Sequence, residues 1–482
     1  MKRLLTFSAL IVTTCLACVA QASVQDEVDR YVQSQMKKRV IPGLQLVVVR
    51  DGSVIKRKAY GVANVELNVP VTNETVFEIA SNSKQFTAGA IMLLDQDGRL
   101  RLDYGITKYL SGLPKTYDEI TIRHLLDHTS GVKDYIEEFQ LNRSLNYTST
   151  ELIERIGANE LNFRPGDNAR YSTTGYVLLG LIIEQITGKG YGEFLRTRIF
   201  EPLGMKQTRA IDLSEIIPNR ASGYRLVQGN LVNGRYVAQT LRASADIGLS
   251  TTASDQAKWD AALGSNKIFT QASLNAMFAP AKLKNGKFAF NDWNGHFGLG
   301  WFIDDYYGHR LINHGGTFIT GFHAEISRFV DKKLTVIILT NRVLSDPASI
   351  SWAVAGHYNS ELLPPYRMVA AKDRNPERSE RLKAFLVNTV AGRFDANSIT
   401  SGFRERLNES QKFDIAEFIK YERSFSFIGC RDIEKLGVER FGSKIKNICH
   451  YKVSGSSKNY FVSFYLSETE KTADLVILSD VD

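Results

Sequence analysis

The stretch FEIASNSKQFT, residues 77–87, places a serine three positions before a lysine at the predicted start of a buried helix. Residues three apart on a helix share one face, so the hydroxyl of Ser81 and the amine of Lys84 can meet. A serine hydroxyl becomes a nucleophile when a neighbouring base takes its proton, and a lysine kept neutral by burial can be that base. The alternative is an ordinary helix start, with Ser81 near the N-cap and Lys84 solvated.

Spacing alone does not separate these two interpretations. Ser34 and Lys37 show the same interval in a charged N-terminal helix, and Ser443 and Lys446 show it in a basic stretch near the C-terminus. Short motifs carry a high false-positive risk. The assignment of Ser81 therefore depends on the rest of the chain.

Length and composition set the class of protein. The chain has 482 residues, of which 43% are hydrophobic and 23% are charged. These values are typical of a soluble globular protein with more than one domain. The net charge is +8, but the sequence contains no long basic run, so we expect no nucleic-acid partner.

The first residues are typical of an export signal. A basic start, Lys2-Arg3, precedes the mostly apolar residues 4–19 and the small-residue site Ala20-Gln21-Ala22. We therefore predict a signal peptide over residues 1–22 and a periplasmic or secreted protein after its cleavage. No later stretch reaches the roughly eighteen apolar residues of a membrane span, so we expect no transmembrane segment. Lipidation at Cys18 is the alternative.

Cysteine content agrees with export. Cleavage after Ala22 would remove Cys15 and Cys18 and leave two cysteines, Cys430 and Cys449. An even number of cysteines in an oxidising compartment favours pairing. We predict one disulfide bond between Cys430 and Cys449.

The pattern of predicted elements indicates an α/β (α+β) protein. A hairpin over residues 44–60 is followed by a region of residues 150–260 that is mainly helical, with helices at 151–158, 173–187, 191–199 and 253–263. Strands are then predicted at 301–304, 309–313, 322–327 and 334–341. Early and late strands around a helical middle predict one sheet built from both ends, with a helical region inserted.

A change of composition marks the end of this region. Prolines 364 and 365 and a charged run lead us to place a linker or boundary helix at 366–382. Residues 383–482 then read as a small α+β domain, with a helix near 403–421 and strands at 425–430, 445–453, 460–466 and 473–478. This part of the sequence contains no chemical motif.

A second candidate stretch is RPGDNARYSTTGY, residues 164–176. It places Tyr171 in a turn just before an apolar helix. A tyrosine, with an ordinary pKa near 10, can act as a base only if nearby cations lower that value. A structural role for Tyr171 is the alternative.

The third stretch is LINHGGTFITGF, residues 311–322. A strand containing Gly315 and Gly316 lets a substrate approach the backbone closely. Such a strand could offer a backbone N–H to an oxyanion, with the imidazole of His314 beside it. The alternative is a glycine bulge with a surface histidine.

The three stretches together resemble the serine β-lactamase and penicillin-binding-protein superfamily, which has a serine-x-x-lysine signature. They occur in its order and rough spacing, and residues 24 to about 362 are similar to its class C β-lactamase-related branch. Supporting stretches are residues 122–131, 199–205 and 297–301. The resemblance implies a serine hydrolase domain over residues 24–365 with a β-lactamase/transpeptidase-like fold, an antiparallel sheet flanked by helices with an inserted helical subdomain.

The resemblance also implies a role for each residue of the first two motifs. Ser81 would be the acylated nucleophile, and Lys84 its base or proton partner. Tyr171 would carry the proton between the nucleophile, the leaving group and water. A charged Lys84 and a phenolate at Tyr171 would favour one another, so the two groups should titrate as a coupled unit.

The third motif would complete the site. The backbone N–H groups of Ser81 and Thr317 would form the oxyanion hole, and His314 would take the place of the usual lysine. The acyl group would lie along the strand at Gly315 and Gly316. The resemblance implies no cofactor.

Two departures from the family pattern bear on the substrate. Thr173 stands where the tyrosine motif usually ends in an asparagine that contacts the substrate. His314 and Gly315 replace the lysine and threonine that help to recognise a substrate carboxylate. The expected activity is acyl transfer on a small-molecule ester, D-amino-acid peptide or β-lactam-like amide, peptidoglycan-derived ones included.

Other interpretations stay open at this point. The same fold could belong to a catalytically silent protein that binds peptidoglycan fragments, or the enzyme could be lipase-like with a Ser-His-Asp triad. His124 and His128 have the i, i+4 spacing of metal ligands, but no third ligand follows at motif spacing, so we expect no metal. The C-terminal domain resembles the small α+β, cystatin-like domains appended to some β-lactamase-related proteins. Its role and the oligomeric state are open.

Overall fold

The computed structural model describes residues 24, 26–290, 295–390, 393, 395, 397–406, 424–436, 438–454 and 459–479. These residues form two compact units, one ending at Tyr358 and the other comprising residues 305–309 and those from Asn359 onward. The predicted signal peptide, the alternative at Cys18 and most of the helix predicted near 403–421 lie outside the described residues. Within the described ranges, no helix has the length and apolar composition needed to cross a membrane.

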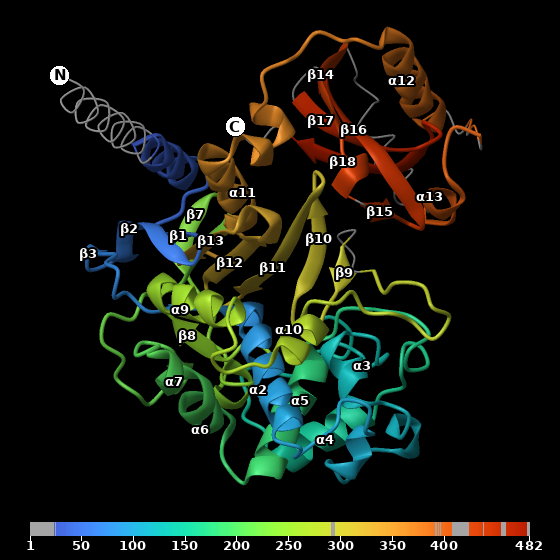
Figure 1. Ribbon diagram of the computed structural model, residues 1–482. Helices are drawn as coiled ribbons and strands as arrows, with labels where there is room; N and C mark the ends of the chain where they lie inside the picture. The colour runs from blue at the N-terminus through green and yellow to red at the C-terminus, as the bar shows by residue number, and fades with distance from the viewer. Residues whose placement is uncertain are drawn as a thin grey trace, which may run out of the picture. The chain divides into compact units, whose positions relative to one another are not determined.

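The first unit is organised on an eight-stranded antiparallel sheet (Figure 1). Leu44 pairs with Thr340, so the early hairpin joins the late strands. This confirms a sheet built from both ends of the region. In spatial order the strands are β3 (Val69–Pro70), β2 (Ser53–Asn64), β1 (Gly43–Arg50), β13 (Leu334–Thr340), β12 (Phe322–Phe329), β11 (His309–Phe318), β10 (Phe302–Tyr306) and β9 (His296–Phe297).

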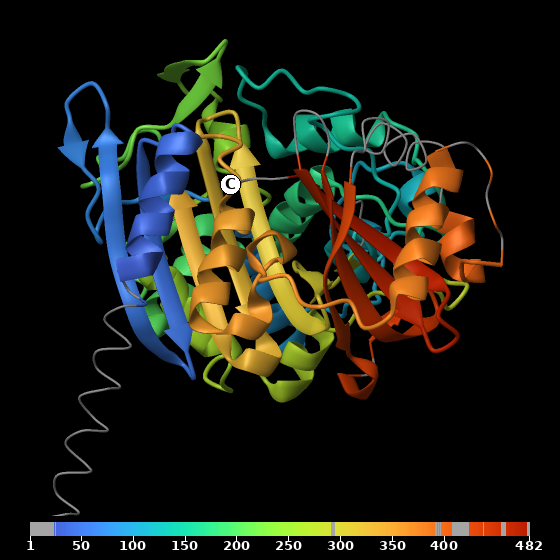
Figure 2. The same ribbon diagram turned by 90° about the horizontal axis from the view of Figure 1, so that it is seen from above.

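The central strands are buried on both faces. In β1, Leu46 and Val48 alternate with Val47 and Val49, and all four are buried. One face is covered by α11 (Pro347–Tyr358) and by a helix over residues 26–38, which Figure 2 shows lying side by side. The opposite face, with Val47 and Val49, packs into the core that also contains residues of α2 and α9.

The helical middle of the unit is present as predicted. The pair α2 (Lys84–Gln96) and α5 (Thr173–Thr187) lies side by side (Figure 1). The bounds of α5 and of α9 (Ala253–Leu263) equal the predicted ones. The remaining helices are α3 (Ile122–Leu126), α4 (Ser149–Gly157), α6 (Tyr191–Leu195), α7 (Glu201–Leu203), α8 (Gln239–Arg242) and α10 (Gln271–Met277).

Short strands outside the main sheet were not predicted from the sequence. Two- to four-residue strands give too little alternation to be recognised. They are β4 (Phe77–Glu78), β8 (Leu249–Thr251) and β5 (Arg209–Ala210), which form a small sheet, and the hairpin β6 (Tyr224–Val227) and β7 (Asn230–Asn233).

The described residues of the second unit form an antiparallel sheet with two α-helices, and its four predicted strands are confirmed. The sheet runs β14 (Ser424–Asp432), β16 (Ser443–Ser454), β17 (Asn459–Ser467) and β18 (Thr472–Ser479), and β15 (Glu439–Arg440) pairs with β16. The helices are α12 (Pro376–Val390) and α13 (Ser401–Arg406).

The helix α12 begins inside the stretch 366–382, where a linker or boundary helix was expected. The helix begins at Pro376, and its Leu382, Phe385 and Leu386 pack into the core of the second unit. Charged residues dominate the first turns of α12, so its apolar stripe is narrow and is easily taken for a linker in the sequence.

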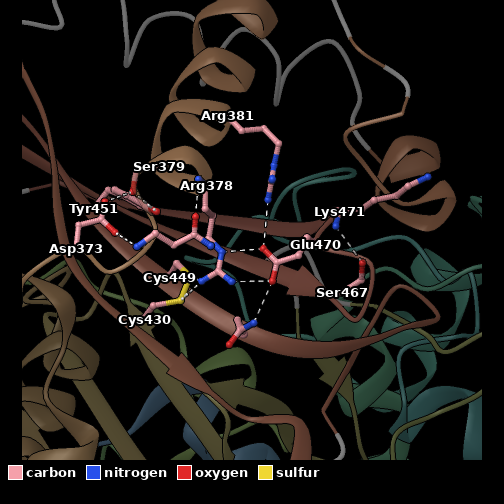
Figure 3. A network of polar contacts seen from close by, with 12 residues as sticks. Asp373, Arg378, Ser379, Arg381, Cys430, Cys449, Tyr451, Ser467, Glu470 and Lys471 are labelled. Carbon is pink, nitrogen blue, oxygen red and sulfur yellow. Dashed lines mark hydrogen bonds and ion pairs between the residues drawn. A yellow bond between two sulfur atoms is a disulfide. The ribbon is translucent and has the colours of Figure 1, made fainter.

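The predicted disulfide bond is present in this second unit. Cys430 on β14 lies directly opposite Cys449 on β16, and the two are bonded. Figure 3 shows the guanidinium of Arg378 beside this bond, with Nη1 3.2 Å from Sγ of Cys430. Arg378 also forms two hydrogen bonds with the carboxylate of Glu470, at 2.7 and 2.8 Å. The disulfide bond links β14 to β16, and the contacts of Arg378 with Cys430 and Glu470 join α12 to the sheet.

Candidate active site

The site begins where β4 turns into α2. A short 3-10 turn, Ala80–Ser83, leads directly into the helix. Ala80 has φ of 45°, a left-handed conformation that is unfavourable for a residue with a side chain and is often found at active sites. Lys84 Nζ lies 3.1 Å from Ser81 Oγ. The predicted meeting of hydroxyl and amine is therefore confirmed, and the solvated alternative is wrong because Lys84 is 0% exposed.

The amine of Lys84 is held from more than one side. It donates a hydrogen bond to the backbone oxygen of Asp246 at 3.0 Å. It also lies 5.1 Å from the ring centroid of Tyr171 and 5.6 Å from that of Tyr176. A lysine between a serine hydroxyl, a carbonyl and two phenol rings is placed to exchange a proton with Ser81.

Tyr171 is positioned by the start of α5. Ser172 is the N-cap of this helix, so Tyr171 lies in the turn before it, as predicted. The backbone N–H of Ser172 donates to Nδ1 of His128 at 3.1 Å, and the rings of His128 and Tyr171 are 4.5 Å apart. Burial lowers the pKa of His128 well below its usual value, and the positive charge of Lys84 lowers it further. His128 is thus a neutral acceptor that packs against Tyr171.

The sequence pattern suggested only one possible role for His128, that of a metal ligand together with His124. Its partner in that spacing, His124, instead caps α3 by accepting the backbone N–H of Thr121. Across the described residues, no cluster of three or more His, Cys, Asp or Glu side chains could hold a metal ion. The supporting stretch 122–131 was the only sequence signal for the contact of His128 with Tyr171.

Strand β11 approaches the nucleophile at Gly316. A Cβ atom there would lie 2.1 Å from the carbonyl oxygen of Ile79 and 2.9 Å from the backbone nitrogen of Ser81. Only glycine fits such a close approach between two backbones. Gly315 faces the other way, where a Cβ would lie 3.0 Å from the carboxylate of Glu325. The two glycines therefore have different surroundings.

A side chain that the sequence did not single out ties β11 to the nucleophile. Asn82 is fully buried, and its Nδ2 donates to the backbone oxygen of His314 at 2.5 Å. Its side-chain oxygen accepts hydrogen bonds from Gln85 and Gln256, both at 2.7 Å. Asn82 lies 232 residues before His314, so no local pattern indicates this contact.

His314 is buried rather than a surface histidine. Its ring stacks on Phe302 at 4.7 Å, and its Nδ1 lies 2.6 Å from the backbone oxygen of Gly315. Burial lowers the pKa of His314 to about 3, with a further contribution from the charge of Lys84. His314 is therefore neutral near pH 7.

The two threonines of the predicted site have separate environments. Thr173 is buried, and its backbone N–H donates to Oδ2 of Asp134 at 2.6 Å. Thr317 is half-buried, and its hydroxyl accepts the backbone N–H of Leu344 at 3.3 Å. The structure thus brings together the Ser81–Lys84 pair, Tyr171 and β11, three segments that are far apart in the chain.

Comparison with known sequences agrees with this arrangement. The family described as Beta-lactamase matches residues 28–357. Penicillin-binding protein 4* of Bacillus subtilis (strain 168) is 31% identical over 314 residues, which cover 62% of this chain and 67% of that protein. Protein flp of Staphylococcus aureus (strain MW2) is 33% identical over 206 residues, covering 42% of this chain and 41% of that protein.

Solved structures give the same result. The octameric penicillin-binding protein homologue from Pyrococcus abyssi shares the fold, with a TM-score of 0.60, 21% identity and coverage of 95% of this chain and 98% of that one. D-amino acid amidase from Ochrobactrum anthropi SV3 has a TM-score of 0.59 and 27% identity, covering 70% of this chain and 99% of that one. With the family match spanning most of the chain, the three motifs and the fold lead to one assignment: the chain belongs to the beta-lactamase family.

Proposed function

We propose that the chain is an exported serine hydrolase that opens an ester or amide through an acyl-enzyme on Ser81. The observation that carries this proposal is the 3.1 Å separation of Lys84 Nζ and Ser81 Oγ inside a buried, aromatic-lined site. A serine and a lysine in such contact have the chemistry of a nucleophile and its proton acceptor. A protein that only holds a ligand has no need of this buried pair.

The proposed reaction has two stages. Ser81 Oγ attacks the substrate carbonyl carbon while its proton passes to the coupled pair of Lys84 and Tyr171. The tetrahedral intermediate collapses, the bond to the leaving group breaks, and the leaving group receives that proton. Water then attacks the acyl-enzyme with the same groups acting in reverse, which releases the acid and restores the hydroxyl.

The backbone N–H groups of Ser81 and Thr317 are proposed to bind the oxyanion. Support comes from the close approach of Gly316 to the backbone nitrogen of Ser81, since it sets β11 directly against the nucleophile. Donors that are already in place when negative charge develops stabilise the transition state without reorganisation. Asn82 contributes by holding the carbonyl of His314 and thus the strand.

The surroundings of His314 favour substrates without a carboxylate at this position. Its imidazole is neutral and stacked on Phe302, and Gly315 offers no hydroxyl. A carboxylate bound there would meet a neutral imidazole in place of a lysine ammonium, and burying a poorly compensated charge is costly. Among the expected substrates we therefore favour neutral esters and D-amino-acid amides over β-lactams and D-alanyl peptides. The structural likeness to D-amino acid amidase supports the amide as a candidate.

A substrate panel with labelling of the nucleophile tests this function. Wild type, Ser81→Ala and the control Ser34→Ala are assayed with a p-nitrophenyl ester, a D-amino-acid amide, a D-alanyl-D-alanine peptide and nitrocefin. Mass spectrometry after treatment with a fluorophosphonate locates any adduct. We expect an adduct on Ser81 and hydrolysis of the first two substrates in wild type and Ser34→Ala, both lost in Ser81→Ala. Folded wild type without an adduct would instead favour the silent binding protein.

Export is a separate part of the proposal. It is supported by the N-terminal sequence and by the disulfide bond between Cys430 and Cys449. N-terminal sequencing of the mature protein should begin at Ser23. A mature chain that retains Lys2 and Arg3 would contradict export through this signal.

A further inference from the structure

Residues 244–249 run beside the Ser81 turn and the start of α2. None of the three sequence motifs includes this segment. The backbone of this segment is hydrogen-bonded to the backbone of Ile79 and to three side chains of residues 83–87, which fixes the segment against the Ser81 turn. The contacts are Ile79 N to Leu249 O at 3.0 Å, Leu249 N to Ser83 Oγ at 3.1 Å, Lys84 Nζ to Asp246 O at 3.0 Å, and Thr87 Oγ1 to Ala245 O at 2.5 Å.

Asp246 in this segment is a fully buried acid. Its side chain is 0% exposed, and its Oδ2 accepts a hydrogen bond from the hydroxyl of Tyr135 at 3.1 Å. Its Oδ1 accepts a hydrogen bond from the hydroxyl of Ser244. Burial raises the pKa of Asp246, and the positive charge of Lys84 acts in the opposite direction. A buried carboxylate is tolerated only with hydrogen bonds and a compensating charge, and both are present here.

Tyr135 extends this network to the second motif. Its backbone N–H donates to Oγ1 of Thr174 at 2.8 Å, and the neighbouring Asp134 accepts the backbone N–H of Thr173 at 2.6 Å. Thr173 and Thr174 form the first turn of α5, immediately after the Tyr171 turn. One chain of contacts therefore runs from the Lys84 amine through Asp246 and Tyr135 to the segment that presents Tyr171.

We propose that Asp246 is a positioning residue for the acyl transfer at Ser81. Its backbone oxygen orients the Lys84 amine, its carboxylate supplies the negative charge that opposes Lys84, and its link through Tyr135 fixes the distance to the Tyr171 turn. This inference rests on the proposed function. It assigns Asp246 no contact with the substrate.

The charge of Asp246 should be visible in the pH dependence of acylation. The titratable groups that face Lys84 are Tyr171, Tyr176, His128, His314 and Asp246, and those that face Asp246 are Lys84, Tyr135 and Tyr191. A carboxylate in this cluster favours the protonated forms of Lys84 and Tyr171. Its removal should therefore let the coupled pair lose its proton at lower pH and make it a weaker base.

The test compares two buried acids of the same unit. Asp246→Asn keeps the shape of the side chain and removes its charge. Asp260→Asn does the same at another buried carboxylate, which accepts hydrogen bonds from Arg328 and Thr335 at 2.6 and 3.1 Å, outside the proposed site. The rate constant for fluorophosphonate labelling of Ser81 is measured against pH, and thermal unfolding is recorded for each variant.

For Asp246→Asn we expect a plateau rate about tenfold lower and an acid-limb midpoint about one pH unit lower than in wild type. Asp260→Asn should keep the wild-type midpoint, even though it unfolds more easily. Folded Asp246→Asn with the wild-type midpoint would overturn the inference and leave the proposed function standing. Wild type that is not labelled at all would sink the proposed function, and this inference with it.

A second variant keeps the inference testable if Asp246→Asn does not fold. Tyr135→Phe removes one hydrogen bond to the carboxylate and breaks the link to the Tyr171 turn, with little change of volume. We expect its labelling rate to fall severalfold, with a smaller shift of the midpoint than in Asp246→Asn. A labelling rate and midpoint equal to those of wild type would contradict the positioning role.

Discussion

Ser81 and Lys84 have the same spacing as Ser34 and Lys37, yet the structure gives the two pairs opposite surroundings. Ser34 and Lys37 are both exposed on the helix over residues 26–38. Lys84 is fully buried and contacts Ser81, the backbone of Asp246 and the ring of Tyr171. The chemistry of a serine-lysine pair therefore comes from what surrounds it, because only burial and fixed partners make the amine a useful proton acceptor.

The third pair with this spacing, Ser443 and Lys446, lies on strand β16. A strand lacks the helical spacing that brings residues three apart together, and the register of β16 shifts between Ile445 and Asn447, at Lys446. The helical geometry that lets Ser81 and Lys84 meet therefore does not apply to this pair. The same serine-lysine interval therefore places the two side chains in different surroundings at a buried helix start, on an exposed helix and on a strand.

Removing the two lysines should give the largest difference between the buried pair and the exposed one. Lys84→Ala is expected to lower the rate of Ser81 labelling about a thousandfold, because the proton acceptor in contact with Ser81 Oγ is lost. Lys37→Ala should leave the rate unchanged. The labelling rates of the two variants are measured by intact-mass spectrometry on samples quenched at successive times. Activity that survives in Lys84→Ala would support the lipase-like triad instead.

Substitution of the two glycines of β11 should lower the activity of the buried site to different degrees. Gly316→Ala is expected to lower the labelling rate about a hundredfold, since its Cβ would meet the backbone of Ile79 and Ser81. Gly315→Ala should cost less than about tenfold, because its Cβ would meet the end of the Glu325 side chain, which can shift. Circular dichroism on both variants controls for folding. Equal losses of labelling rate in the two variants would contradict the close approach of Gly316 to the backbone of Ser81.

A separate effect concerns the pH dependence of stability and Glu325, which lies on β12 beside Gly315. Burial raises the pKa of Glu325 to about 8, from an ordinary value of 4.5. Between these values the unfolded chain releases a proton that the folded chain retains. The stabilising contribution of Glu325 is therefore complete below about pH 4.5 and is lost as the pH rises toward 8, by about 1.4 kcal/mol per pH unit.

Glu325→Gln removes this titration and keeps the shape of the side chain. We expect the free energy of unfolding of the variant to gain on that of wild type as the pH rises from about 5 to about 8. Urea unfolding at several pH values measures the difference. An exposed acid such as Glu74 offers the control, because Glu74→Gln should show no comparable trend. Parallel curves for wild type and Glu325→Gln would contradict the buried, protonated state.

Much of the scaffold follows from local pattern. The early hairpin, the bounds of α5 and α9, and the four strands of the second unit agree with the periodicity of their apolar residues. Cys430 and Cys449 pair because they are directly opposite on adjacent strands. At 366–382 the sequence left open a linker or a boundary helix, because the charged first turns of α12 concealed its apolar stripe.

For the site, the sequence by itself predicted that Ser81 and Lys84 can meet, and it set the order in which Tyr171 and His314 follow. Helix periodicity and turn residues involve only a few neighbouring positions, so they can be recognised in the sequence. Only the tertiary structure decided that Asn82 holds the His314 carbonyl, that His128 packs on Tyr171 and that Asp246 stands behind Lys84. Those contacts join residues that are distant in sequence, and burial, which sets the charge of His314, exists only once the chain has folded.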